Sequence, residues 1–155
     1  MKIRKASRND AQAIAVQNVL LAQESENISL EHDTVLKGVQ AILADPKKGF
    51  YVIAEEKNMI IGQLMITFEW SDWKNAPIWW IQSVYVQKNW RKKGVFTQLL
   101  QYVQQKAREK HVAMFRLYVH KNNNAAQKVY QQFGLEKQPY VFYQLKNNKK
   151  KEKTL

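Results

Sequence analysis

The chain predicts a mixed α/β fold in one domain, with a mixed sheet flanked by helices, and three observations lead to this class. Segments with strand periodicity and segments with helix periodicity follow one another in the order β-α-α-β-β-β-α-β-α-β. The length of 155 residues suits one domain with a core of its own. The apolar content of 45% and the aromatic content of 12% are too high for a disordered chain.

The first half of the chain predicts one strand, two helices and a hairpin. A capping box over residues 7–10 (Ser-Arg-Asn-Asp) starts the first helix, and Pro46 stops the second. The polar residues 56–58 provide a turn between two strands with alternating apolar side chains. The expected elements are a strand over 3–5, helices from residue 7 to about 24 and over 31–44, and strands over 50–54 and 60–68.

The second half predicts three more strands and two helices. Residues 78–86 and 114–119 are apolar on both faces, as is expected for central strands of a sheet. Helical spacing extends from residue 95 to about 110 and over 123–133, where Gly134 ends the second of these helices. Residues 70–77 are expected to form a loop, and a final strand over 140–145 completes the order.

Several classes of protein are excluded by composition and pattern. No apolar run approaches the roughly 18 residues of a membrane span, and no apolar segment follows the N-terminal charges as in a secretory signal. The absence of cysteine excludes disulfides, thiolate zinc sites and thiol catalysis. We therefore expect a cytoplasmic protein, with its domain over residues 1–146 and a frayed basic tail over residues 147–155.

The net charge of +12 is distributed unevenly along the chain. Residues 1–73 hold eight basic and ten acidic residues, whereas residues 74–135 hold eleven basic residues and one acidic residue. This division suits a polyanion bound at one place and a cationic molecule bound at another. The lysine-rich tail lacks the interleaved aromatic residues that single-stranded nucleic-acid binding uses, so we interpret it as a solvated end.

A phosphate-binding turn is predicted where a central strand ends and the next helix begins. Arg91, Lys92 and Lys93 stand directly before Gly94, and the helix starts near Val95. The N–H groups of a first helical turn and the helix dipole attract anions, and a glycine lets the backbone approach the ligand closely. The same four residues would also suit an ordinary exposed helix start.

Two motifs resemble those of the GCN5-related N-acetyltransferases. Residues 81–100, with Arg91-Lys92-Lys93-Gly94-Val95-Phe96 at their centre, resemble the family's Arg/Gln-x-x-Gly-x-Gly/Ala motif, except that Phe96 replaces its last small residue. The pattern Asn123-x-x-Ala126-x-x-x-Tyr130-x-x-x-Gly134-Leu135 resembles the family's second motif. The resemblance covers residues 1–145. It implies a mostly antiparallel sheet of six to seven strands, splayed between the fourth and fifth and flanked by about four helices.

The resemblance also implies acetyl-CoA as the cofactor. In the family, the turn holds the pyrophosphate, the pantetheine arm lies in the gap between the splayed strands, and a backbone N–H near Tyr85 polarises the thioester carbonyl. The implied cofactor-binding residues are Val84, Tyr85, Val86, Arg91, Lys92, Lys93, Gly94, Val95, Phe96, Thr97, Asn123, Ala126 and Tyr130.

Two catalytic residues follow from the same resemblance. Tyr130 matches the family's general acid, which protonates the sulfur of CoA, although its spacing also suits a core aromatic. Glu69 ends a strand where several members place a base, although it could be a solvated strand-end carboxylate; Asp72 is the substitute. His120 reads better as part of a surface turn. His32 and His111 lack partners at metal-ligand spacing, so no metal is expected.

The acceptor is expected opposite the cofactor. Carboxylates and aromatic rings suit a cationic amine, which they bind by ion pairing and cation–π contact. Solvated helix ends and core tryptophans would explain the same residues. The candidates are Glu24, Glu26, Trp70, Asp72, Trp73 and Gln82.

We therefore expect an enzyme that transfers acetyl from acetyl-CoA to a primary amine of a small molecule or peptide, directly within a ternary complex. The lack of cysteine excludes an acetyl-cysteine intermediate. The expected partners include no membrane, nucleic acid is disfavoured, and the family makes a homodimer a possible assembly. The alternatives are a basic nucleic-acid-binding module and an acyl-CoA-binding domain without catalysis.

Overall fold

The computed structural model describes residues 1–147, in two compact units that divide after Asn122. The predicted tail lies outside the described residues except for residue 147. The first unit contains β1 (Lys2–Lys5), the short helix η1 (Arg8–Asp10), α1 (Ala11–Glu26), α2 (His32–Ala44), β2 (Phe50–Glu56), β3 (Met59–Ser71), β4 (Ala76–Val86), η2 (Lys88–Trp90), α3 (Val95–Glu109) and β5 (Met114–Leu117). The second contains α4 (Asn124–Gln132).

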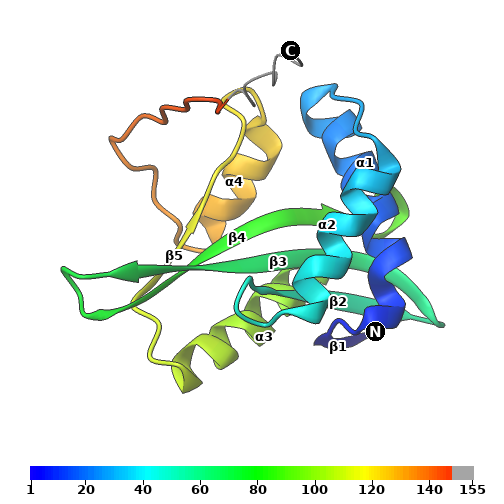
Figure 1. Ribbon diagram of the computed structural model, residues 1–155, viewed down its shortest axis with the longest axis horizontal. Helices are drawn as coiled ribbons and strands as arrows, with labels where there is room; N and C mark the ends of the chain where they lie inside the picture. The colour runs from blue at the N-terminus through cyan, green and yellow to red at the C-terminus, as the bar shows by residue number, and fades with distance from the viewer. Residues whose placement is uncertain (148–155) are drawn as a thin grey trace, which may run out of the picture. The chain divides into compact units, whose positions relative to one another are not determined.

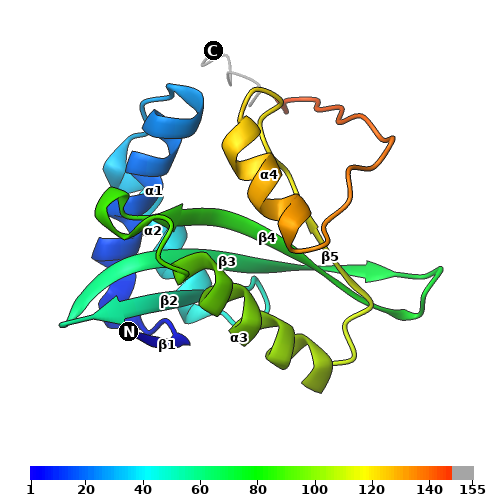
Figure 2. The same ribbon diagram turned by 180° about the vertical axis from the view of Figure 1, so that it is seen from behind.

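The sheet of the first unit is mixed and mostly antiparallel, as expected. Its strand order is β1-β2-β3-β4-β5; only β4 and β5 run parallel. Helices α1 and α2 lie on one face of the sheet and α3 lies on the other (Figures 1 and 2). The sheet has five strands within residues 1–147, so the expected count of six to seven is slightly too high.

The predicted strand over residues 140–145 is wrong. Residues 140–147 form no strand in the part of the chain that the structure describes, and the side chains of Tyr143 and Leu145 are 88% and 90% exposed. Alternating aromatic and branched residues favour an extended backbone, but a strand also needs a neighbour that accepts and donates its ladder hydrogen bonds. That neighbour cannot be read from the segment itself.

The loop predicted over residues 70–77 is also too long. Strand β3 continues to Ser71, paired with Ala76, and β4 already includes Pro77, paired with Trp70. Only residues 72–75 turn between the strands. The long β3–β4 hairpin results, because a proline at the beginning of a strand need not interrupt its pairing.

Two apolar layers cover the sheet. On the α1–α2 face, Ile14 and Val39 pack with Ile53 and Met65 of the sheet. On the other face, Val95, Leu99 and Val103 of α3 are buried, at the helical spacing i, i+4, i+8. No helix among the described residues is long and apolar enough to cross a membrane.

Gly62 lets the beginning of α3 approach the sheet closely. A Cβ atom at this position would lie 2.7 Å from Cγ1 of Val95 and 3.3 Å from the carbonyl oxygen of Tyr85. Any other residue would require one of these neighbours to move. The lack of a side chain at Gly62 therefore allows Val95, the first residue of α3, to lie close to the end of β4.

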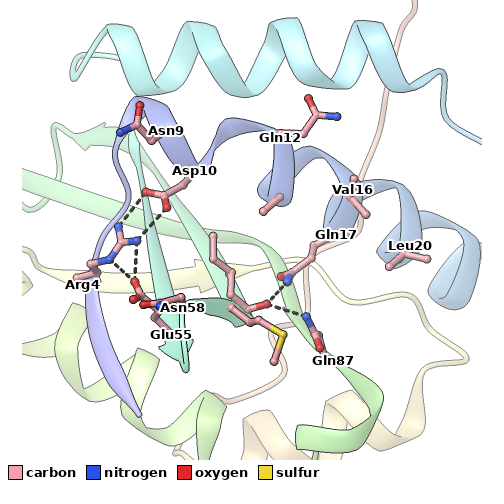
Figure 3. A pocket seen from close by; sticks show the side chains of 13 residues that line it. Arg4, Asn9, Asp10, Gln12, Val16, Gln17, Leu20, Glu55, Asn58 and Gln87 are labelled. Carbon is pink, nitrogen blue, oxygen red and sulfur yellow. Dashed lines mark hydrogen bonds and ion pairs between the residues drawn. The ribbon is translucent and has the colours of Figure 1, made fainter.

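A shallow groove of about 620 Å³ lies along the N-terminal half of α1, lined also by β1 and the β2–β3 turn (Figure 3). At one end, the guanidinium of Arg4 donates to both oxygens of Asp10, at 2.8 and 2.9 Å, and to Glu55 at 2.8 Å. The hydrogen bonds from Arg4 lower the pKa of Asp10 to about 2. This cluster ties β1, η1 and β2 together.

Candidate active site

Strand β4 contains a bulge that the sequence pattern did not predict. Gln63 of β3 pairs with Tyr85 and Met65 pairs with Gln82, so two residues of β4 stand opposite one residue of β3. Ser83, the first bulged residue, has a φ of 50°, which is uncommon for a residue with a side chain. Such a conformation persists only where the surrounding structure imposes it, and it is found often at functional sites.

A chain of hydrogen-bonded amides, one half-buried and one buried, runs from α1 into the sheet beside the bulge. The fully buried amide of Gln63 donates to Oδ1 of Asn18 at 2.7 Å, and Asn18 donates to the hydroxyl of Tyr51 at 3.0 Å. Burial raises the pKa of Tyr51, although hydrogen bonds with Asn18 and Ser83 act to lower it. These side chains therefore link α1 to the bulged residue through polar contacts inside an apolar core.

Strands β4 and β5 stop pairing just before the bulge. Their last pair is Ile81 with Leu117, whereas β4 continues to Val86. Among residues 1–147, no strand pairs with the far side of residues 82–86. Backbone groups along such an edge can hydrogen-bond an extended ligand, and Val84, Tyr85 and Val86 lie on this unpaired part of β4.

The turn after β4 has a backbone suited to an anion. Lys92 has a φ of 60° and Gly94 a φ of 77°, both in the left-handed region, and Gly94 is the N-cap of α3. A glycine N-cap has no side chain to satisfy the N–H groups of the first helical turn. No atom other than its chain neighbours lies within 4 Å of the position a Cβ would take at Gly94, so the turn has room for a ligand.

Cations surround this turn, and they differ in their partners. Among the described residues, Lys92 and Lys93 form no ion pair; Lys93 lies over the ring of Trp90 at 5.3 Å. Arg91 instead donates from Nε to the carbonyl of Val86 at 2.9 Å and from Nη2 to Glu24 at 2.6 Å. The two lysines thus supply positive charge that no described acidic residue neutralises.

The structure places Glu24 next to Arg91, in the turn before α3. Its carboxylate accepts from Arg91 and from the hydroxyl of Tyr85, and Lys88 lies 3.7 Å away. Burial acts to raise the pKa of Glu24, but the hydrogen bonds from Arg91 and Tyr85 lower it below its usual value. Burial, followed by the hydrogen bond to Glu24, raises the pKa of Tyr85.

Phe96 and Thr97 lie half-buried in the first turn of α3, directly after Val95. The bulky Phe96 stands where the family's motif has a small residue. Phe96 prevents neither the burial of Val95 beside Gly62 nor the left-handed backbone of Gly94.

Glu69 belongs to a polar cluster on the α1–α2 face of the sheet. Arg116 of β5 donates to both of its oxygens, at 3.0 and 3.2 Å, and Nε1 of Trp80 donates to one of them at 2.5 Å. The ring of Tyr118 lies 4.6 Å from that of Trp80. Gln82, also on this face, donates to Oγ1 of Thr67 at 2.6 Å. Glu69 therefore accepts hydrogen bonds from two neighbouring strands, β4 and β5.

The other expected acceptor residues lie elsewhere. Asp72 and Trp73 occupy the hairpin turn, where the side chain of Trp73 is 94% exposed and its N–H donates to Asp72. From this turn to the bulge is roughly 25 Å along β4, at about 3.3 Å per residue. Trp70 is exposed near the end of β3, and Glu26 is exposed at the end of α1. Among the described contacts, none joins these four residues to the bulge.

In the second unit, the motif residues around Tyr130 define a helix. Oδ1 of Asn123 accepts from the N–H of Ala126 at 3.1 Å and caps the start of α4. At the other end, Gly134 has a φ of 79°, and Leu135 donates to the carbonyl of Tyr130 in a Schellman motif. Burial raises the pKa of Tyr130, so its hydroxyl stays protonated at neutral pH.

Three residues of the first unit were not identified from the sequence. Ser83 carries the bulge, and Arg116 and Tyr118 complete the cluster around Glu69. The sequence could have indicated Arg116, because a charged residue in the middle of an apolar strand is expected to have a partner of opposite charge. It gave no such indication for Ser83, since a serine in a strand does not indicate a positive φ.

Comparisons with known proteins identify the family and the fold. The sequence model of the acetyltransferase (GNAT) family matches residues 14–135. The structure of a possible acetyltransferase from Clostridium difficile 630 is 37% identical, with a TM-score of 0.88 over 96% of this chain and 98% of that chain. A search of curated proteins found no match.

A predicted acetyltransferase from Clostridium acetobutylicum, solved with acetyl-CoA, is 20% identical, with a TM-score of 0.78 over 93% of this chain and 95% of that chain. At this identity the likeness concerns the fold alone. The family match, in contrast, covers the sheet, the turn at Gly94 and α4. The chain therefore belongs to the acetyltransferase (GNAT) family.

Proposed function

We propose that the protein is an acetyl-CoA-dependent N-acetyltransferase that transfers acetyl to a primary amine by direct attack within a ternary complex. The observation that carries this proposal is the succession of a bulged β4, its separation from β5 and the left-handed turn at Gly94. An extended thioester with a diphosphate at one end fits such a succession. The thioester supplies the activated acyl group.

The turn would bind the diphosphate. The first N–H groups of α3 point toward it, and Lys92 and Lys93 add charge without a described acidic partner. Val84, Tyr85 and Val86 would hold the pantetheine through backbone groups, and the N–H near Tyr85 would polarise the carbonyl to be attacked. In the second unit, Asn123 and Ala126 would support this site by fixing the start of α4.

Two side chains would move protons. Tyr130, kept protonated by its raised pKa, would donate its proton to the departing sulfur. Glu69, held in place by hydrogen bonds from Arg116 and Trp80, would accept the proton of the amine through water. Because the chain has no cysteine, it cannot hold the acetyl group on a thiol between the two half-reactions.

The acceptor would lie on the α1–α2 face of the sheet, near Gln82. Trp80 and Tyr118 offer an aromatic surface there, and Glu69 offers a carboxylate for a cationic amine. A small molecule or a peptide with a primary amine suits this chemistry.

A panel of amines with acetyl-CoA, read by thiol release and by the mass of the product, tests the function. We expect release of CoA to match N-acetylated product one to one. Binding of CoA without any acetylated product across small amines and peptides would instead indicate a binding domain without catalysis. A parent protein that binds RNA but not CoA would overturn the proposal.

Replacing Tyr130 with Phe removes the proposed acid and keeps the ring. Since general acids contribute about 100-fold or more, we expect kcat to fall by about 100-fold while the Kd for CoA changes little. Steady-state kinetics and isothermal titration measure the two effects. A kcat equal to that of the parent would remove Tyr130 from the mechanism.

A further inference from the structure

Glu24 joins helix α1 to the cofactor turn through contacts that the proposed reaction does not use. It stands 67 residues before Arg91 and 61 before Tyr85, yet its Oε2 accepts from Arg91 at 2.6 Å and its Oε1 from the Tyr85 hydroxyl at 3.1 Å. The Glu24 side chain is 24% exposed, and that of Arg91 44%. Both oxygens therefore have a donor from a different element of the fold.

Arg91 is held from three directions. Its Nε donates to the carbonyl of Val86 at 2.9 Å, its Nη2 donates to Glu24, and its guanidinium lies 5.6 Å from the centre of the Tyr85 ring. A guanidinium fixed in this way presents its charge beside the turn in an orientation set before any anion binds.

We propose that Glu24 is a positioning residue of the cofactor site: it holds Arg91 against the end of β4, so that the turn is formed before a diphosphate ester binds. The inference rests on the proposed function and assigns Glu24 to the cofactor rather than to the acceptor. Rigid sites bind more tightly because less conformational freedom is lost on binding.

The charges support positioning rather than neutralisation. Glu24 faces two cations, Lys88 at 3.7 Å and Arg91 at 2.6 Å, and Lys92 and Lys93 are paired with no described acidic residue. One carboxylate can therefore orient Arg91 while the turn keeps an excess of positive charge. If Glu24 instead competed with the diphosphate for Arg91, its removal would strengthen binding, so the two roles differ in sign.

Glu24→Gln keeps the size of the side chain and removes its charge, and isothermal titration with CoA measures the effect. We expect the Kd to rise about five- to tenfold, as for a partly exposed hydrogen bond between charged groups. With acetyl-CoA varied, KM should rise similarly, while kcat and the KM of the amine stay within about twofold. Glu109→Gln, which breaks the ion pair with Lys106 at the far end of α3, is the control and should leave the Kd unchanged.

Arg91→Lys gives a second measurement that does not depend on changing α1. A lysine keeps the charge but cannot donate to Val86 and Glu24 together in the planar geometry of arginine, so we expect a similar loss. In the double variant with Glu24→Gln the two losses of CoA affinity should not add, because both substitutions remove the same contact between Arg91 and Glu24.

An unchanged or lower Kd for Glu24→Gln, with a melting temperature near that of the parent, would overturn the inference. A rise confined to the KM of the amine would also overturn it and return Glu24 to the acceptor site. If Glu24→Gln fails to fold, the Arg91→Lys and Tyr85→Phe variants replace it, because both residues donate to Glu24. Losses of CoA affinity that add in their double variant would then overturn the inference. A parent protein that does not bind CoA would contradict the proposed function itself, which is a distinct result.

Discussion

Helix α1 has a cluster of charged residues near each end, and the two clusters differ in their balance of charge. Near its N-terminus, one cation, Arg4, is shared by two carboxylates, Asp10 and Glu55 (Figure 3). Near its C-terminus, one carboxylate, Glu24, faces two cations, and further lysines follow in the turn before α3. The first cluster joins three elements that end beside one another, whereas the second borders a left-handed turn.

The difference indicates what each cluster does. Each of the three guanidinium nitrogens of Arg4 donates to a carboxylate, and Asp10 also accepts from the backbone and hydroxyl of Ser7. This cluster therefore stabilises the fold and has little capacity for a ligand. The cluster around Glu24 retains excess positive charge beside backbone donors, which is what an anion requires. Substitutions in the two clusters should therefore change different quantities.

The largest expected effect is on binding. Reversing the charges of Lys92 and Lys93 to Glu changes the charge beside the turn by four units. We expect the affinity for CoA to fall at least about 100-fold, equivalent to about 2.7 kcal/mol, by Coulomb repulsion that salt weakens. Titration at several salt concentrations measures this loss. A pantetheine ligand that lacks phosphates should bind both proteins equally, and equal losses for the two ligands would contradict a phosphate-binding role.

Replacing Arg4 with Gln should act on stability instead. Asp10 and Glu55 would be left without their cation, one of them buried, so we expect the free energy of unfolding to fall by about 2 kcal/mol. The affinity for CoA should be the same as that of the parent. Denaturant unfolding and titration of the same sample measure the two quantities, and a loss of CoA affinity in the folded variant would contradict the separation of the clusters.

The smallest effect concerns pH. The pKa of Asp10 is about 2 in the fold against an ordinary value of 3.8, so the stability it contributes is complete above about pH 4 and is lost as the pH falls through 2. We expect Asp10→Asn to lower the free energy of unfolding by about 1 to 2 kcal/mol at pH 7 and to flatten its fall below pH 4. Unfolding curves from pH 7 to pH 2 test this, and parallel curves for the two proteins would contradict it.

Much of the fold could be predicted because its signals are local. Capping residues, Pro46 and apolar periodicity gave the order of the first nine elements, which is confirmed. The last strand was wrong because pairing depends on a distant neighbour and not on the segment 140–145. The length of the β3–β4 hairpin was missed for a related reason, since Trp70 and Pro77 continue the pairing despite their residue types.

The site was predictable only where its signal is also local. Gly94 after three cations marked the turn, because a left-handed N-cap is a property of that one position. The partner of Glu24 is 67 residues away and that of Glu69 is 47 residues away, so no spacing in the sequence could have indicated either contact. The bulge at Ser83 is imposed by the strands around it.

The helix α4 affects how its motif should be read in other chains. Of the residues that make the motif conspicuous, Asn123 begins the helix and Gly134 ends it. The need to fold can therefore by itself maintain Asn123 and Gly134, even in a related protein that has lost its activity. Under the role proposed for Tyr130, a relative that keeps Asn123 and Gly134 but replaces the tyrosine would keep the helix and lose the general acid.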